Sequence, residues 1–415
     1  MNKEEEVQQT EQVLLALRDP STIRLQAHRI LNMAKKDQLE HFALDPEKMT
    51  ATASFVIDVI TSQYPDLNIP YHSRWRHFEV GGVDRIKKMQ DQLSHYSATE
   101  RGKILYELVI ISVFLDAGAG PSWHFLDADT GKEYSRSEGL ALASLSLYQK
   151  GVFSNNPTDP FRVDAQSLLN FNEETLFKGF QVSPTNLLEG AKGRVALLNR
   201  LGNIINHNTQ YFGTQGRLGD FYSYISSLQT NNRLSATKIF QAVLNGFNEV
   251  WPVRLLFHGV SLGDVWIHKA LKTNTPGSEY IPFHKLSQWL SYSLIEPLEH
   301  AGIKVTDLDS LTGLPEYRNG GLLVDTELLQ VKNKNLLVAP QDPGSEAIVE
   351  WRALTIALLD ELAELIRKQL HKDASSLPLA KILQGGTWEA GRQIARKKRA
   401  QGTPPIQIIS DGTVF

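Results

Sequence analysis

The chain has 415 residues, and 43 basic against 46 acidic side chains give it a formal net charge of −3. Proteins that work mainly by binding nucleic acid need a basic excess, so we expect no nucleic-acid partner. The sequence contains no cysteine, which excludes disulfides, thiolate metal sites and a cysteine nucleophile. The most apolar run covers 108–115, far short of the roughly 20 residues of a membrane span, and the acidic N-terminus is unlike a signal peptide. We therefore expect a soluble cytoplasmic protein.

Helical patterns dominate the beginning of the chain. Asp-Pro pairs at 19–20 and 45–46 predict two helix starts, because proline is tolerated in a first helical turn. Segment 64–82 then breaks the helical periodicity with prolines and glycines. The nearly all-apolar segment 98–116 predicts a helix at the centre of the core, ended by glycines and a proline at 118–121.

The rest of the chain continues this pattern. Weak alternation over 123–134 predicts a hairpin, and strands do not alternate regularly with helices. We therefore predict a mainly α architecture with a few short hairpins, divided at 209–219 into helical halves 1–210 and 211–415 unless both form one unit. The other elements that we expect are helices at 137–150, 164–180, 185–206, 217–228, 235–248, 283–301 (kinked at Pro297), 345–370 and 378–399, a strand within 254–260, turns over 303–323 and an extended tail over 403–415.

One catalytic motif matches. Gly259, Ser261 and Gly263 fit the G-x-S-x-G pattern of serine hydrolases. In those enzymes a strand and a helix of a parallel sheet present the serine, and no parallel sheet is predicted here. A turn is therefore favoured, and an amide or ester hydrolase using Ser261 is kept only as a third hypothesis.

Basic and aromatic side chains cluster in the irregular segment 71–79. Guanidinium groups beside flat rings suit a phosphate or carboxylate next to a planar group. The alternative, equally favoured, is a loop whose aromatic rings fill the core. The candidate binding residues in this segment are His72, Arg74, Trp75, Arg76 and His77.

Segment 311–321 carries a carboxylate, a phenol and a guanidinium at Glu316, Tyr317 and Arg318, and Asp325 follows it. Loops on a rigid helical scaffold commonly hold functional groups. A carboxylate in such a loop could act as a general acid or base. The alternative is a capped turn, in which the acidic residues cap helices.

Two further groups are weaker candidates. Glu350 and Arg352 lie in the first turns of the helix predicted at 345–370, where a capped, solvated helix start is favoured over a site. Asp264 and His268 fall on one side of a short predicted strand. Acidic side chains and the 12 histidines could hold a metal, but no spacing is diagnostic, so no metal site is predicted.

The helix predicted at 283–301 begins with polar residues. His284, Lys285 and Gln288 share one of its faces, and Trp289 lies beside them. That face would suit a polar ligand, and a solvent-exposed face is an equal alternative.

Eight segments of the chain stand out together: 69–78, 115–121, 135–140, 282–290, 311–321, 349–355, 383–388 and 410–415. In these segments the chain resembles the uracil-catabolism "protein four" family, a family of unknown function. The resemblance implies a role in a uracil-degrading route, in which uracil becomes its ribonucleotide, the ring is opened and a ribosyl-urea species appears.

The second half of the chain is also similar to queuosine-salvage proteins. The similarity lies in the order of the helix at 283–297, the loop at 311–321 and the acidic helix after 344. Those relatives are N-glycosyl hydrolases, so the resemblance implies a helical, DNA-glycosylase-like scaffold. Their loop carries an Asp-Tyr-Arg word, and this chain has Glu316, Tyr317 and Arg318, with an acid one methylene longer.

Together the resemblances imply a hydrolase of an N-ribosyl bond, in ribosyl-urea or its 5′-phosphate. Glu316 is expected to stabilise oxocarbenium character and to orient or deprotonate water, with Asp325 or Glu350 as alternatives. No cofactor is expected, and the expected partner is a small nucleoside- or nucleotide-derived substrate. The alternative is a non-catalytic nucleotide-binding or regulatory component of the same route. The expected substrate-binding residues are His72, Arg74, Trp75, Arg76, His77, Arg136, Asp264, His284, Lys285, Gln288, Trp289, Tyr317, Arg318 and Arg352.

Overall fold

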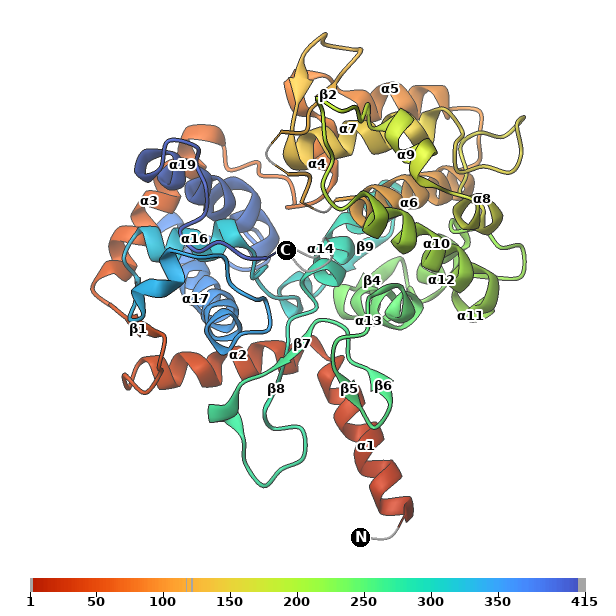
Figure 1. The fold of residues 1–415 in the computed structure, drawn as a ribbon. Coiled ribbons are helices and arrows are strands. Elements are labelled where there is room, and N and C mark those ends of the chain that lie inside the picture. Colours follow the sequence, from red (N-terminus) through yellow and green to blue (C-terminus); the bar gives the residue numbers. More distant parts are fainter. Residues whose placement is uncertain (1–2, 117, 121, 410–415) are drawn as a thin grey trace.

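Helices form most of the structure, in agreement with the predicted mainly α architecture (Figure 1). The computed structural model describes residues 3–116, 118–120 and 122–409. As the sequence predicts, Asp19 caps the helix that follows it, accepting the N–H of Ser21 at 2.8 Å. The first helices are α1 (Lys3–Leu17), α2 (Pro20–Ala34), α3 (Lys48–Gln63), α4 (Trp75–Phe78), α5 (Arg85–Gln92), α6 (Ala98–Phe114) and α7 (Arg136–Gln149).

Helix α6 is the predicted central helix. It begins at an N-cap, Ser97, whose side chain accepts the N–H of Glu100. Beyond Leu105 its residues are buried on every side, which explains why all of them except Glu107 and Ser112 are aliphatic or aromatic. The helices that follow in the middle of the chain are α8 (Ala165–Leu169), α9 (Glu173–Gly179), α10 (Ala191–His207), α11 (Thr209–Phe212), α12 (Asp220–Ser227) and α13 (Ala236–Gly246).

The last helices pack with the first ones. Helix α2 lies against α17, and α3 lies against α17 and α19 on the left of Figure 1, while α6 and α8–α13 gather on the right. Helix α14 lies near the middle of Figure 1 and contacts α6 and α13 of the right-hand group. The helices of this part are α14 (Lys285–Ser293), α15 (Ile295–His300), α16 (Tyr317–Asp325), α17 (Glu346–Leu370), α18 (Leu379–Ile382) and α19 (Trp388–Lys398), with a π-helical turn over Leu383–Thr387.

Glycines allow helix α16 to pack closely on two neighbours. A Cβ on Gly320 would lie 2.7 Å from the Trp351 ring on α17, whose indole N–H donates to the Gly320 carbonyl at 3.1 Å. A Cβ on Gly391 of α19 would lie 2.3 Å from the carbonyl oxygen of Arg318. Helix α16 is therefore clamped between α17 and α19, which holds its N-terminus in place.

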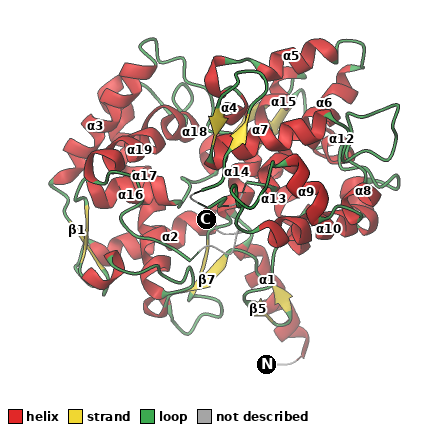
Figure 2. Cartoon of the chain, turned by 45° about the horizontal axis from the view of Figure 1, so that its top comes forward, coloured by secondary structure: helices red, strands yellow, loops and turns green. Residues whose placement is uncertain are grey.

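Short strands pair at the edges of this helical structure (Figure 2). All strands in the described ranges belong to two-stranded sheets, and only the β4–β9 pair is parallel. The predicted hairpin at 123–134 is confirmed as β2–β3. The pairs are β1 (Phe42–Leu44) with β10 (Leu329–Val331), β2 (Phe125–Leu126) with β3 (Glu133–Tyr134), β4 (Arg233–Ser235) with β9 (Lys304–Thr306), β5 (Leu256–Phe257) with β6 (Val260–Ser261), and β7 (Val265–Ile267) with β8 (Tyr280–Pro282).

Some predicted elements differ from the structure. The turn-rich segment 303–323 contains the start of α16, because glycines that read as turn residues serve close helix packing instead. The helix at 283–301 is divided at Leu294, before Pro297, and the predicted strand at 254–260 is part of the β5–β6 hairpin. Helix α1 was not predicted, because its mostly exposed residues form no marked apolar stripe.

The described end of the chain has no helix after α19, and Ile408 forms a parallel bridge with Gln341. Residues 410–415 of the predicted extended tail, and Pro121 of the predicted helix stop, lie outside the described residues. Across the part of the chain that the structure describes, no helix combines the length and the apolar character needed to cross a membrane.

Candidate functional site

A cavity of about 470 Å³ lies where three helices, α7, α14 and α16, begin. This volume is typical of sites for small organic molecules. The first residues of the three helices, Arg136, Lys285 and Tyr317, all line the cavity. The structure thus brings together seven of the residues predicted from the sequence: His72, His77, Arg136, Lys285, Trp289, Glu316 and Tyr317.

Glu316 both caps a helix and lines the cavity. Its Oε2 accepts the N–H of Arg318 at 2.6 Å, and its Oε1 accepts the N–H of Asn319 at 2.7 Å. Burial raises the pKa of the Glu316 carboxyl, although these N–H groups and the Lys285 ammonium oppose the rise. Because each carboxylate oxygen has a second lone pair, the cap leaves acceptor capacity for a ligand or a water molecule.

The backbone of Lys285 is held by the ion pair between Asp264 and Arg352. Its backbone N–H donates to Asp264 Oδ2 at 3.0 Å, and Asp264 also pairs with the Arg352 guanidinium through two bonds of 2.7 and 2.8 Å. Burial alone would raise the pKa of Asp264, but Arg352 and the N–H donors lower it by more. The net pKa of Asp264 is therefore below the ordinary aspartate value, and the carboxylate stays ionised. Burial lowers the pKa of the Lys285 ammonium, while Glu316 and Asp116 act in the opposite direction.

Asp116 is a second carboxylate that lines the cavity, just beyond the end of α6. Its Oδ1 lies 3.2 Å from an Arg74 guanidinium nitrogen, and its Oδ2 accepts the Ser137 hydroxyl at 3.3 Å. Arg74 is fully buried and also donates to Ser112 Oγ at 2.7 Å. Arg74 was predicted to bind an anionic group of a ligand. In the structure the anionic group beside it is Asp116 of the protein itself.

Histidine and tryptophan rings form one wall. The His77 ring lies 5.8 Å from the Trp289 ring, edge on, and 6.3 Å from the Trp388 ring. Burial lowers the pKa of His77 to about 3 and that of His72 to about 4, so both rings are neutral near pH 7. His72 Nδ1 lies 3.0 Å from Gln384 Oε1. This wall offers flat, uncharged surface to a ligand.

A buried amide links α14 to the segment that leads to Glu316. Gln288 Nε2 donates to Thr312 Oγ1 at 2.7 Å, and its Oε1 accepts the Thr312 N–H at 2.8 Å. Tyr292, one turn further along α14, donates to the Thr312 carbonyl at 3.0 Å. Gln288 thus holds the two helix starts that bear Lys285 and Glu316 in a fixed relation, and it does not itself line the cavity.

Other predicted site residues lie away from this cavity. Asp325 forms a two-bond ion pair with Arg399, with distances of 2.8 and 2.5 Å. Glu350 is fully buried, accepts the N–H groups of His41 and Phe42, and lies 3.3 Å from His268 Nε2. The two alternative carboxylates therefore stabilise the fold at other places.

The remaining predicted residues have partners within the protein. Arg76 pairs with Glu296 at 2.7 Å, and the Trp75 indole N–H donates to the Ser293 carbonyl, beside a separate cavity of about 350 Å³. Arg318 donates to the Gly402 carbonyl at 2.8 Å. His284 Nε2 lies 2.8 Å from the Leu17 carbonyl oxygen. Sequence alone gave no sign of these partners, which are distant in the chain.

Asp116, Ser137 and Trp388 are among the lining residues that were not predicted as site residues. One signal pointed to Asp116, because a carboxylate directly ends an almost all-apolar helix before a glycine-rich stop. Trp388 ends one of the segments that carry the family resemblance. A single sequence does not show that these segments meet in space.

The G-x-S-x-G motif lies in the β5–β6 hairpin. Ser261 is on β6, and Gly259 has a φ of +83° in the turn. No helix follows this short strand directly, as a nucleophile elbow would require. The turn interpretation of the motif therefore agrees with the structure.

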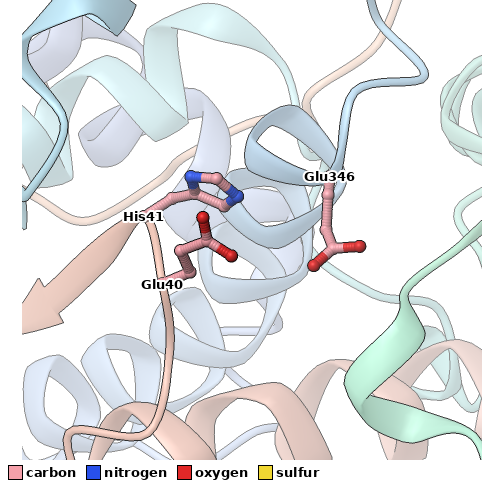
Figure 3. Close-up of side chains that lie close together, drawn as sticks. All are labelled: Glu40, His41 and Glu346. Atoms are coloured by element: carbon pink, nitrogen blue, oxygen red, sulfur yellow. The ribbon is translucent and has the colours of Figure 1, made fainter.

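A possible ligand set for a cation lies elsewhere on the molecule. Glu40 and His41, before β1, approach Glu346 at the start of α17 (Figure 3), and one ligand atom of each lies within 4.8 Å of the others. Glu40 is exposed, and the Lys269 ammonium lies 3.8 Å from Glu346, where it competes with a cation. None of these residues lines the cavity described above.

The fold and cavity define a mainly α protein with a pocket built at helix starts and lined by charged and aromatic side chains. Residues 16–415 match the family described as a protein of unknown function (DUF1688). The chain is 38% identical over 412 residues to "Protein urg3" of Schizosaccharomyces pombe, covering 97% of this chain and 98% of the relative. It is 36% identical over 430 residues to "Uracil catabolism protein 4" of Lachancea kluyveri, covering 95% and 97%. The chain therefore belongs to the DUF1688 family.

Proposed function

We propose that this protein acts in uracil catabolism and hydrolyses the N-ribosyl bond of ribosyl-urea or its 5′-phosphate. The place in uracil catabolism is supported by the name of the Lachancea kluyveri relative, "Uracil catabolism protein 4", which aligns over 97% of its length. The reaction is supported chiefly by one observation. The buried Glu316 carboxylate, at the start of α16, lines the same cavity as a second carboxylate, Asp116.

The reaction exchanges one bond for another at the anomeric carbon. Water adds its oxygen to C1′ of the ribose as the C1′–N bond to the urea group breaks. Glu316 accepts the proton that water loses, and the departing nitrogen takes up a proton from solvent. Glu316 then returns its proton to solvent, so one water is consumed and the products are urea and the free sugar. Cleavage of such bonds develops positive charge on the sugar ring, which a nearby carboxylate stabilises.

The other lining groups suit the two parts of this substrate. Asp116 can accept a hydrogen bond from a ribose hydroxyl while Arg74 holds it in place. The neutral rings of His77, Trp289 and Trp388 can pack against the sugar and the flat ureido group. A dry wall of this kind also strengthens the electrostatic effect of Glu316 on the transition state.

Incubation of the purified protein with ribosyl-urea, and separately with its 5′-phosphate, tests the proposal. Mass spectrometry should detect urea and the corresponding sugar from at least one of them. Binding of both compounds without release of urea would reject the hydrolase and favour a non-catalytic binding component. A fluorophosphonate probe should leave Ser261 unlabelled.

A further inference from the structure

Two cationic side chains, Arg136 and Lys285, line the cavity without a close ion-pair partner among the described residues. Within the described residues, neither the Arg136 guanidinium nor the Lys285 ammonium makes an ion pair or a side-chain hydrogen bond. The carboxylates that share the cavity already have partners, because Asp116 pairs with Arg74 and Glu316 accepts two backbone N–H groups. Glu316 and Asp116 act on the Lys285 charge through space. In the described cavity wall and its ion pair, three cations (Arg74, Arg136 and Lys285) nevertheless face two carboxylates (Asp116 and Glu316), so one positive charge is left over.

The three helix starts differ in how their N–H groups are satisfied. Asp264 accepts a first-turn N–H of α14, and Glu316 caps α16. Helix α7 has 14 residues, and its N-cap residue Ser135 makes no side-chain capping bond. The first turn of α7, which carries Arg136 and Ser137 into the cavity wall, thus offers N–H groups and the positive end of a helix dipole to an anion.

Two buried nitrogens in the same wall also lack partners. Trp289 Nε1 and His77 Nδ1 find no hydrogen-bond partner among the residues that the structure describes, although the residues are only 6% and 8% exposed. An indole N–H can only donate, so Trp289 requires an acceptor. Buried donors without partners are rare in proteins, and their place beside a cavity indicates that a ligand supplies the acceptor.

We propose that Arg136, Lys285 and the start of α7 bind the phosphate of a ribose 5-phosphate group, so that the substrate is phosphorylated. The two negative charges of a phosphate dianion match the positive charges of Arg136 and Lys285. A single carboxylate carries only one negative charge, and a sugar without phosphate carries none. The choice of ribose rests on the function proposed above, whereas the anion site rests on the geometry alone. Three other arginines expected to bind the substrate, Arg74, Arg76 and Arg318, have partners within the protein.

Binding of ribose 5-phosphate and of ribose, measured by calorimetry, tests the site without requiring turnover. The wild-type protein should bind the phosphate ester at least about tenfold more tightly than ribose. Arg136→Gln and Lys285→Gln should each remove most of this difference. Arg233→Gln, which replaces an exposed arginine of β4 outside the cavity, should leave it unchanged.

The outcomes separate this inference from the hydrolase. Equal binding of ribose and ribose 5-phosphate, or equal loss in Arg136→Gln and Arg233→Gln, would overturn the phosphate site even if ribosyl-urea is hydrolysed. Selective binding of ribose 5-phosphate that depends on Arg136, without any release of urea, would support the phosphate site and reject the hydrolase. Normal thermal unfolding of the exposed Arg136 variant would show that its loss of binding is local.

Discussion

Lys285, the first residue of α14, and Glu316, the N-cap of α16, line one cavity. Burial shifts their pKa values toward each other, raising that of Glu316 above 4.5 and lowering that of Lys285 below 10.5. Each charge also opposes the shift of the other. Their relation is fixed by Gln288, which reaches from α14 to the segment before Glu316.

The activity should therefore have a narrow pH range. If ionised Glu316 is required, activity is lost as pH falls through a pKa above the ordinary glutamate value. If charged Lys285 binds the phosphate, affinity is lost as pH rises through a pKa below the ordinary lysine value. A profile of kcat/KM against pH should show both limbs, and Lys285→Gln should abolish the alkaline limb. An unchanged alkaline limb in that variant would exclude this role for Lys285.

Replacing the proposed catalytic carboxylate should separate activity from folding. Glu316→Gln should lower kcat by at least about 100-fold, the usual contribution of a general acid or base. It should cost only about 1 kcal/mol in the free energy of unfolding, because a weaker helix cap remains. Steady-state kinetics and denaturant unfolding measure the two effects.

Asp325→Asn is the matched control for that variant. Asp325 pairs with Arg399 and does not line the cavity, so kcat should be unchanged although stability falls. A large loss of kcat in Asp325→Asn, with normal turnover by Glu316→Gln, would transfer the catalytic role to Asp325.

The hydrogen bonds between Gln288 of α14 and Thr312 should affect catalysis by holding Glu316 in position relative to Lys285. Thr312→Val removes the hydroxyl that Gln288 Nε2 donates to, and leaves that buried amide without its acceptor. We expect kcat to fall several-fold with little change in KM. Thr355→Val removes a buried hydroxyl in α17 that bonds to the Trp351 carbonyl, and should lower stability without changing kcat. Equal kcat losses in both variants would contradict a positioning role.

The Asp264–Arg352 pair should be a large contributor to stability. Arg352→Met leaves a buried carboxylate without its cation, which typically costs about 3–5 kcal/mol. Asp264→Asn combined with Arg352→Met should recover part of this loss, because no charge is then left buried. Urea unfolding of the single and double variants measures the coupling. Additive losses in the double variant would mean that the two residues act independently.

Helices could be predicted from the sequence where a single segment contains the whole signal, either its apolar pattern or its capping residues. Helices α6 and α17 were predicted because their apolar residues are continuous or periodic, and α2 because Asp19 and Pro20 mark its start. It misread α16, whose adjacent glycines indicate a turn until the Trp351 ring that packs on Gly320 is known. A contact between segments that are distant in the sequence, such as the one between Gly320 and Trp351, cannot be inferred from the residues of one segment.

The candidate site could be predicted only in part, because its residues come from segments that are distant in the sequence. Glu316, Lys285 and Trp289 were chosen by side-chain chemistry, and the structure brings them to one cavity. Arg74 and Arg352 have the same chemistry, but their acidic partners, Asp116 and Asp264, come from distant segments. A sequence does not distinguish an arginine that is paired inside the protein from one, such as Arg136, for which the described residues offer no ion pair.

The central claim is that the bond between ribose and urea nitrogen is the one that breaks. Ribosyl-urea 5′-phosphate labelled with ¹³C at the urea carbonyl should be incubated with the protein and followed by ¹³C NMR. The account predicts that the label appears as free urea, at a rate that Glu316→Gln greatly reduces. Label that stays in the substrate, or that appears as bicarbonate through cleavage within the urea group, would contradict it.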